Sequence, residues 1–103
     1  MTAQFREEMR VAVRASARLH DVAAAAVMRG ERGRAVDGAR QVAMCALVIS
    51  GWSLSDTGRA FGRHHTTVMY ARESAYEKVP GCVQAVIGTV LGVRSARTPE
   101  GST

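Results

Sequence analysis

Apolar residues recur along this chain at the spacing of a helix, and no segment of useful length alternates as a half-buried strand does. From Phe5 to Ala17 they stand three or four residues apart, and the same spacing runs from Val83 to Leu91. We therefore predict an all-α fold, a small bundle of five to six helices.

Glycine and capping residues divide this pattern into helices. Gly51 follows an apolar run over Val36–Ser50, which we expect to form the central buried helix. Asp21 is expected to cap a short helix over Val22–Met28. Each boundary thus has a residue whose chemistry favours a helix end.

The segment Leu54–Tyr76 has the layout of a helix-turn-helix. Ser53 precedes a short helix over about Leu54–Phe61, and Gly62 ends it. The next helix starts around His64 with polar residues. This is the most informative part of the sequence.

The length of 103 residues is enough for one domain. We assign residues 1–93 to that domain. Residues 94–103 show no apolar pattern, so we predict a disordered tail there.

The charge balance favours a polyanionic partner. The chain has 14 Lys and Arg against 9 Asp and Glu, a formal charge of +5 at pH 7, and Lys78 is its one lysine. Hydrophobic residues make up 47%, which is typical of a folded domain and too high for a disordered basic tail. Nucleic acid, or less often an anionic membrane surface, is the expected partner.

The sequence argues against membrane insertion and secretion. No window approaches the roughly 18 apolar residues of a membrane span. Charges at Arg6, Glu7, Glu8 and Arg10 interrupt any apolar stretch near the N-terminus. We expect a cytoplasmic, nucleoid-associated protein with no membrane partner.

Residues for catalysis or metal binding are too few to argue a site. Cys45 lies in an apolar run and is expected to be a small core residue. His64 and His65 are adjacent, without the i, i+4 spacing of a zinc pair on a helix, and His20 is remote in sequence. We predict no enzyme activity, no metal and no cofactor.

Four polar residues at the start of the second helix of the helix-turn-helix are candidates for reading bases. A recognition helix meets the major groove with its N-terminal residues. Thr offers a hydroxyl and a methyl group, and neutral His offers one donor and one acceptor. The alternative is an ordinary solvated helix start capped by Thr. The candidates are His64, His65, Thr66 and Thr67.

Arginines supply the remaining candidates. Arg40, near the start of the central helix, could enter a narrow minor groove, where the potential is most negative, or it could be a surface arginine with a solvated head. Arg29, Arg32 and Arg34 lie in a basic loop suited to phosphates, or serve solubility. A stripe of arginines at i, i+4 steps along the first helix fits a solvated face better than DNA contact. The stripe comprises Arg6, Arg10, Arg14 and Arg18.

Arg40–Met44, and Ser53–Gly58 together with Phe61–Val68, form two stretches that resemble the C-terminal DNA-binding domain of the bacterial replication initiator DnaA. The family carries an Arg-Gln-Val-Ala-Met stretch, found here at Arg40–Met44. It also carries Ser-Leu-x-x-Ile-Gly followed by Phe-Gly-(Gly)-Arg-Asp-His-Thr-Thr-Val, to which Ser53–Gly58 and Phe61–Val68 are similar. The likeness is strong over Arg34–Val79 and weaker in the first two helices and the last one.

The resemblance implies a Trp-repressor-like helical bundle that binds a short asymmetric box in double-stranded DNA. It implies that Arg40 enters the minor groove and that His65, Thr66 and Thr67 read bases in the major groove. Phosphate contacts are expected from Arg29, Arg32, Arg34, Arg63, Ser53 and Thr66. One monomer per box is expected, in competition with a full-length initiator.

Three positions depart from the family pattern. His64 stands where the family has Asp; Asp can accept from a cytosine amino group, whereas a protonated His cannot. Gly62 replaces a glycine pair, which shortens the turn by one residue, and Thr57 replaces Ile. The preferred box is therefore expected to be altered or relaxed at one base.

The sequence contains no Gly-x-x-x-x-Gly-Lys-Ser/Thr loop, so we predict no nucleotide cofactor and no ATPase step. The chain is expected to bind boxes and to regulate replication initiation or transcription without opening a duplex itself. A different class of function stays open. The apolar helix Val83–Leu91 could serve as an interface in a protein-interaction module that has lost specific DNA binding.

Overall fold

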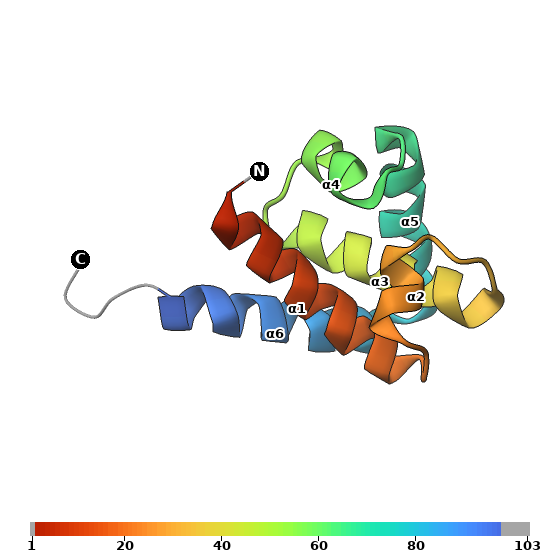
Figure 1. Ribbon diagram of the computed structural model, residues 1–103, viewed down its shortest axis with the longest axis horizontal. Helices are drawn as coiled ribbons and strands as arrows, with labels where there is room; N and C mark the ends of the chain where they lie inside the picture. Colours follow the sequence, from red (N-terminus) through yellow and green to blue (C-terminus); the bar gives the residue numbers. More distant parts are fainter. Residues whose placement is uncertain (1, 98–103) are drawn as a thin grey trace.

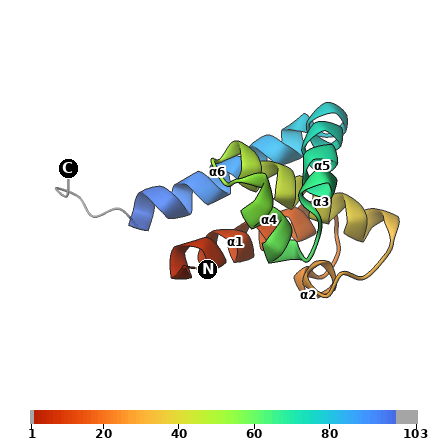
Figure 2. The ribbon, with the colours of Figure 1, turned by 90° about the horizontal axis from the view of Figure 1, so that it is seen from above.

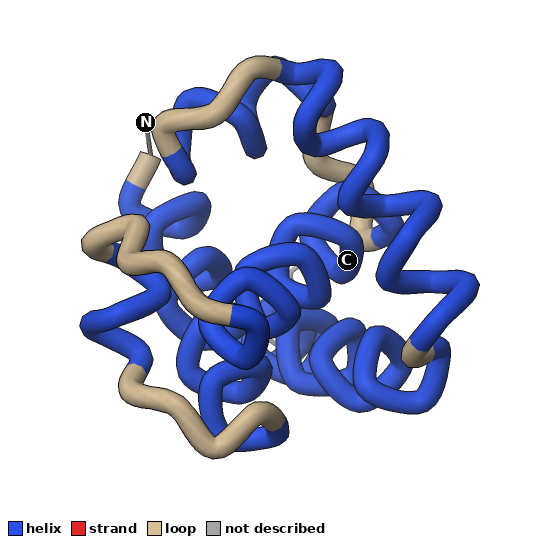
Figure 3. Tube along the Cα trace, turned by 90° about the vertical axis from the view of Figure 1, so that its right-hand side faces the viewer, coloured by secondary structure: helices blue, strands red, loops and turns tan. Residues whose placement is uncertain are grey.

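The computed structural model describes residues 2–97, which form six helices and no strand (Figures 1 and 3). The predicted all-α fold with a helix-turn-helix is confirmed. The helices are α1 (Ala3–Leu19), α2 (Ala24–Met28), α3 (Arg34–Ile49), α4 (Leu54–Phe61), α5 (His65–Lys78) and α6 (Pro80–Arg97).

Helix α3 is the centre of the fold, as its apolar run predicts. It packs against α1, α5 and α6, and Val42, Leu47 and Cys45 have no exposed surface. The Cys45 thiol lies 3.3 Å from the carbonyl oxygen of Arg72. Burial raises the pKa of Cys45 to about 11, so this cysteine is an inert core residue.

Helices α1 and α6 run side by side in opposite directions along one side of α3, while α4 and α5 lie on the other side (Figures 1 and 2). Helix α1 buries Met9, Val13 and Ala17, the face that its spacing predicts. Ser16 on the same face donates to the carbonyl oxygen of Ala39 at 2.5 Å, which links α1 to α3. The helix-turn-helix formed by α4 and α5 therefore packs on a group of three helices, α1, α3 and α6.

A buried carboxylate joins α1 to α6. The Glu8 side chain is 5% exposed and accepts hydrogen bonds from Arg94, Arg97 and the Trp52 indole. Arg94 also donates to the carbonyl oxygen of Ser50 at 2.8 Å. The bonds from Arg94, and also those from Arg97 and Trp52, hold the pKa of Glu8 at about 2, despite burial, which acts in the opposite direction.

This cluster corrects one prediction. Residues 94–103 are expected from the sequence to be a disordered tail, yet α6 continues to Arg97. Arg94 and Arg97 lack apolar periodicity because they are fixed by Glu8, 86 and 89 positions away in sequence. Residues 98–103 lie outside the described part of the chain.

The start of α2 also differs from the prediction. Helix α2 begins at Ala24, two residues later than expected, and its N-cap is Ala23 without a side-chain hydrogen bond. Asp21 has a φ of 55° and makes the turn out of α1 instead of capping α2. Asp tolerates the left-handed region better than most residues, which explains its place there.

Within residues 2–97, no helix by itself has the length and hydropathy of a membrane span; α5 and α6, at 115° to each other, reach those values only when combined.

Replacing Glu8 by Gln should lower the free energy of unfolding by about 3 kcal/mol at pH 7, because the buried side chain at position 8 no longer supplies the anion that pairs with the partly exposed Arg94 and Arg97. The folded-state pKa of about 2 lies below the ordinary 4.5, so ionised Glu8 stabilises the fold above about pH 5 and ceases to do so as the pH falls towards 2. Urea unfolding between about pH 2.5 and 7 should show the difference from the native protein shrinking on acidification.

Glu77→Gln on the exposed face of α5 is the matched control and should change stability by less than about 0.5 kcal/mol. A pH-independent deficit in the Glu8 variant would contradict the ion-pair account.

Candidate nucleic-acid interface

The turn between α4 and α5 is a closed hydrogen-bonded motif. Gly62 has a φ of 66°, the left-handed conformation that glycine adopts without a Cβ penalty. Its N–H donates to the Arg59 carbonyl, and the next N–H, of Arg63, donates to the Gly58 carbonyl at 2.8 Å. This is a Schellman ending, and it fixes the direction in which the chain leaves α4.

Gly58 is required where α5 approaches α4. A Cβ at this position would lie 2.5 Å from the backbone oxygen of Arg63, closer than packed atoms come. No role for Gly58 is predicted from the sequence, because a glycine inside a helix has no local signature of a close approach. Its position four residues before Gly62 places both glycines on the side of α4 that faces the turn.

Helix α4 starts as predicted. The Ser53 side chain accepts from the Asp56 N–H at 3.0 Å. Thr57, in place of the family's Ile, is fully buried and its hydroxyl donates to the Ser53 carbonyl at 2.8 Å. The hydroxyl thus has a partner and costs little in the core.

His64 is the N-cap of α5. Its Nδ1 accepts from the Thr66 backbone N–H at 3.2 Å, and the Thr66 hydroxyl lies 2.8 Å from the same nitrogen. The His65 ring lies beside the His64 ring, with centroids 4.3 Å apart. The helix start is therefore ordered by a histidine, where the alternative interpretation from the sequence has a threonine.

His65 and Thr67 are exposed, and within residues 2–97 the Thr67 hydroxyl has no side-chain hydrogen bond. Val68 and Ala71 on the opposite side of α5 are buried against Met44 of α3. Packing thus turns the polar start of α5 outwards, as the sequence predicts.

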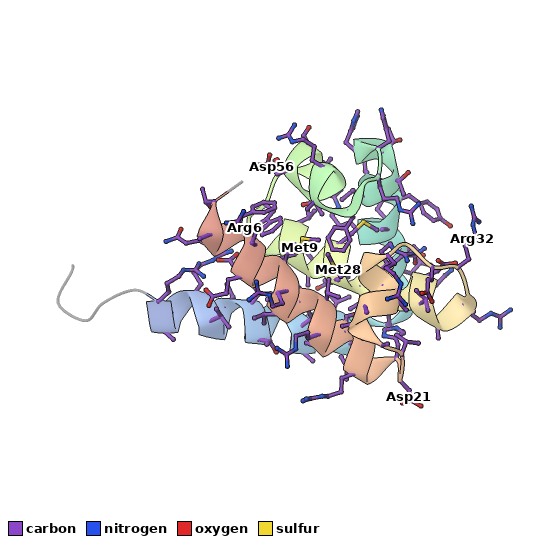
Figure 4. All side chains as sticks on the ribbon, in the orientation of Figure 1. Arg6, Met9, Asp21, Met28, Arg32 and Asp56 are labelled. Carbon is purple, nitrogen blue, oxygen red and sulfur yellow. The ribbon has the colours of Figure 1, made fainter. Side chains whose placement is uncertain are left out.

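A groove of about 310 Å³ separates the α2–α3 loop from α5. Arg32 and Arg63 line it from the loop and the turn, and Thr67 lines it from α5. The Arg63 side chain reaches across to the loop, since a Cβ at Gly30 would lie 3.7 Å from its guanidinium. Figure 4 shows Arg32 directed outwards from the loop.

Tyr70 also lines this groove and is 62% exposed, but it is not among the candidates predicted from the sequence. It follows Thr67 by three residues, so it lies on the same face of α5. That spacing was the signal that could have found it.

Arg40 lies where neither sequence-based interpretation puts it. Both give its guanidinium to DNA or water, yet Arg40 is 5% exposed. It donates to the carbonyl oxygens of Val27 and Glu31, at 3.3 and 2.9 Å, and pairs with Asp37 at 2.9 Å. A buried arginine is tolerable because both terminal nitrogens of its guanidinium have partners, and here it fastens the α2–α3 loop to α3.

Four predicted phosphate ligands do not line the groove: Thr66 is at the start of α5, and Arg29, Arg34 and Ser53 lie elsewhere. The Arg29 guanidinium is paired with Glu31, and the Ser53 hydroxyl caps α4. Arg34 borders a separate hollow beside His20 and Lys78. The structure thus brings Arg32, Arg40, Arg63 and Thr67 together and leaves Arg29, Arg34 and Ser53 apart.

The arginine stripe lies on another surface. Arg6, Arg10 and Arg14 line an apolar hollow of about 350 Å³ between α1 and α2, together with Met9 and Met28. Figure 4 labels Arg6, Met9 and Met28. Arg18 is exposed further along the helix. Within residues 2–97, no group of three or more His, Cys, Asp or Glu side chains could hold a metal ion.

The helix-turn-helix and its basic groove agree with the one comparison that gives a match. Residues 13–74 match the family model of the bacterial DnaA protein helix-turn-helix. The chain belongs to the DnaA helix-turn-helix family. Comparison with curated proteins and with solved structures gives no match.

Membership of the DnaA helix-turn-helix family indicates binding to double-stranded DNA, and the family's domain is non-catalytic. The match runs from the middle of α1 to Ser74 of α5 and contains the loop, the turn and the polar start of α5. The family therefore accounts for the part of the fold that carries the candidate interface.

Replacing Gly58 by Ala should destabilise the fold by about 1–3 kcal/mol, because the new methyl group forces the Arg63 carbonyl to move. Gly88→Ala is the control: a Cβ at this exposed position of α6 meets nothing within 4 Å and should stabilise by up to about 1 kcal/mol. Thermal unfolding of both variants measures the contrast. Equal stabilisation in both would show that the close approach does not exist.

Proposed function

We propose that this protein binds short asymmetric boxes in double-stranded DNA, similar to those of DnaA, as one monomer per box. The observation that carries the proposal is the outward-facing polar start of α5 beside a groove lined by arginines. In this role it competes with a full-length initiator and regulates replication initiation or transcription, in the cytoplasm at the nucleoid.

In the proposed complex, the N-terminus of α5 enters the major groove. His64, His65, Thr66 and Thr67 are all exposed at its first turn. The Thr67 hydroxyl can donate and accept, and its methyl group can contact a thymine methyl. The positive end of the helix dipole favours a nearby phosphate.

Arginines around this helix hold phosphates in the same proposal. Arg32 and Arg63 are exposed at the groove and are best placed. Arg29, Arg34, Ser53 and Thr66 complete the proposed set; Arg29 would exchange Glu31 for a phosphate, and Ser53 would add a phosphate to its capping bond. These contacts orient the protein and carry no sequence information.

The proposal includes a minor-groove contact by Arg40, for which DNA must compete with the intramolecular partners of its guanidinium. Its guanidinium exchanges Asp37 and the carbonyl oxygens of Val27 and Glu31 for the edges of A/T base pairs, whose narrow groove has an enhanced negative potential. The loop then rearranges on binding, because the Glu31 carbonyl oxygen loses the Arg40 donor and the Val27 carbonyl oxygen keeps only the bond from the Gly30 N–H.

Replacing Thr67 by Ala should weaken binding to the preferred duplex by about 1–3 kcal/mol and leave binding to random duplex nearly unchanged, because Thr67 reads bases. Thr89→Ala, at an exposed helical threonine on α6, is the matched control and should change neither. Fluorescence anisotropy with duplexes enriched from a random pool measures both affinities. Equal losses on both duplexes would refute base reading by Thr67.

Replacing Arg40 by Ala should weaken binding to a box flanked by A/T pairs more than to the same box flanked by G/C pairs, because only the former has the narrow groove. Anisotropy on the two duplexes gives the comparison. The same loss on both would assign Arg40 to loop fastening alone and remove the minor-groove contact.

No observation favours the alternative of an interaction module built on the helix Val83–Leu91. Val83, Val86 and Val90 are fully buried in the core, and Leu91 alone of that apolar face is well exposed, at 44%. The face that would form the interface holds α6 to the domain.

A further inference from the structure

The cap at the start of α5 fixes which nitrogen of His64 carries the proton. A backbone N–H can only donate, so the Nδ1 that faces the Thr66 N–H must offer a lone pair. In a neutral ring the proton is then on Nε2. The Thr66 hydroxyl, 2.8 Å from Nδ1, donates to the same lone pair.

The capping bonds also fix the orientation of the ring. Turning it over would replace Nδ1 by a carbon and leave the Thr66 N–H and hydroxyl without their acceptor. The His65 ring, 4.3 Å away and tilted by 34°, restricts the same rotation. The side chain is exposed, so Nε2–H is the group of His64 that remains for an external partner.

We propose that His64 is a specificity residue that donates a hydrogen bond from Nε2 to a base with acceptors only on its major-groove edge. Guanine is the base that fits best, since it presents N7 and O6 and has no methyl group in the way. This inference rests on the proposed function, because it names what one residue of the interface reads.

The proposal reverses what a carboxylate would do at the same place. An Asp at an N-cap accepts from the helix N–H with one oxygen and presents only further acceptors outwards. It would select cytosine, whose N4 amino group is a donor. The residue type at position 64 therefore determines whether guanine or cytosine is preferred on the strand that it contacts.

Two substitutions separate donor from acceptor without removing the cap. Asn and Asp cap helices about equally well and have nearly the same shape. His64→Asn uses its amide oxygen in the cap and presents an NH₂ donor outwards, as His64 does. His64→Asp presents only acceptors.

Enrichment of boxes from random duplexes with the native protein, His64→Asn and His64→Asp tests the proposal. The native protein and the Asn variant should share guanine at one position, preferred by about fivefold or more, and the Asp variant should change that position to cytosine. The rest of the box should stay the same in all three. Identical boxes from the native protein and the Asp variant would overturn the proposal and leave the proposed function standing.

If none of the three proteins enriches any sequence, both the proposed function and this inference fail. Long-range ¹H–¹⁵N correlation of the imidazole nitrogens in the free protein at about pH 8, where a typical histidine is neutral, gives a second test without DNA. Nε2 should carry the proton of His64 and Nδ1 should not. A protonated Nδ1 would overturn the inference.

Discussion

The close approach of α5 to α4 determines the geometry of the interface. Gly62 turns the chain through the left-handed region, and Gly58 leaves room for the Arg63 carbonyl. Arg63, His64 and the first residues of α5 follow directly, so their directions depend on these two glycines. Any side chain at position 58 forces the backbone to move, and the polar start of α5 moves with it.

The charged residues of this basic protein fall into two groups, one that stabilises the fold and one that is exposed at the candidate interface. Glu8 of α1 pairs with Arg94 and Arg97 of α6. The buried Arg40 of α3 fastens the α2–α3 loop. Arg32 and Arg63, by contrast, remain exposed beside α5. Composition alone predicts a polyanionic partner, but only burial shows which arginines are available to it.

The sequence predicts much of this fold because its signals are local. The spacing of apolar residues finds the buried face of α1, and Ser53 and Gly62 mark both ends of α4. The errors arise where a contact with a residue distant in sequence determines the structure: Glu8 orders the end of α6, and the carbonyl oxygens of Val27 and Glu31 hold the Arg40 guanidinium. Tyr70 shares a face of α5 with Thr67, so the same local spacing could also have identified Tyr70 as a groove residue.

The candidate site also combines features that local sequence signals predict with features that only the structure shows. The residue types at the start of α5 and their outward direction come from the sequence, because Val68 and Ala71 fix the buried side of the helix. The sequence does not predict that His64 caps α5, since histidine is not among the preferred capping residues. Its contacts with Thr66 come from the structure and give the ring a defined donor.

Titration of the ¹⁵N-labelled protein with an enriched duplex at about 0.15 M salt, followed by backbone amide shifts, tests the central claim most directly. The account predicts the largest changes at the start of α5, the α4–α5 turn and the loop between α2 and α3, with little change along α6. Changes confined to the arginine stripe of α1, or none at all, would contradict it.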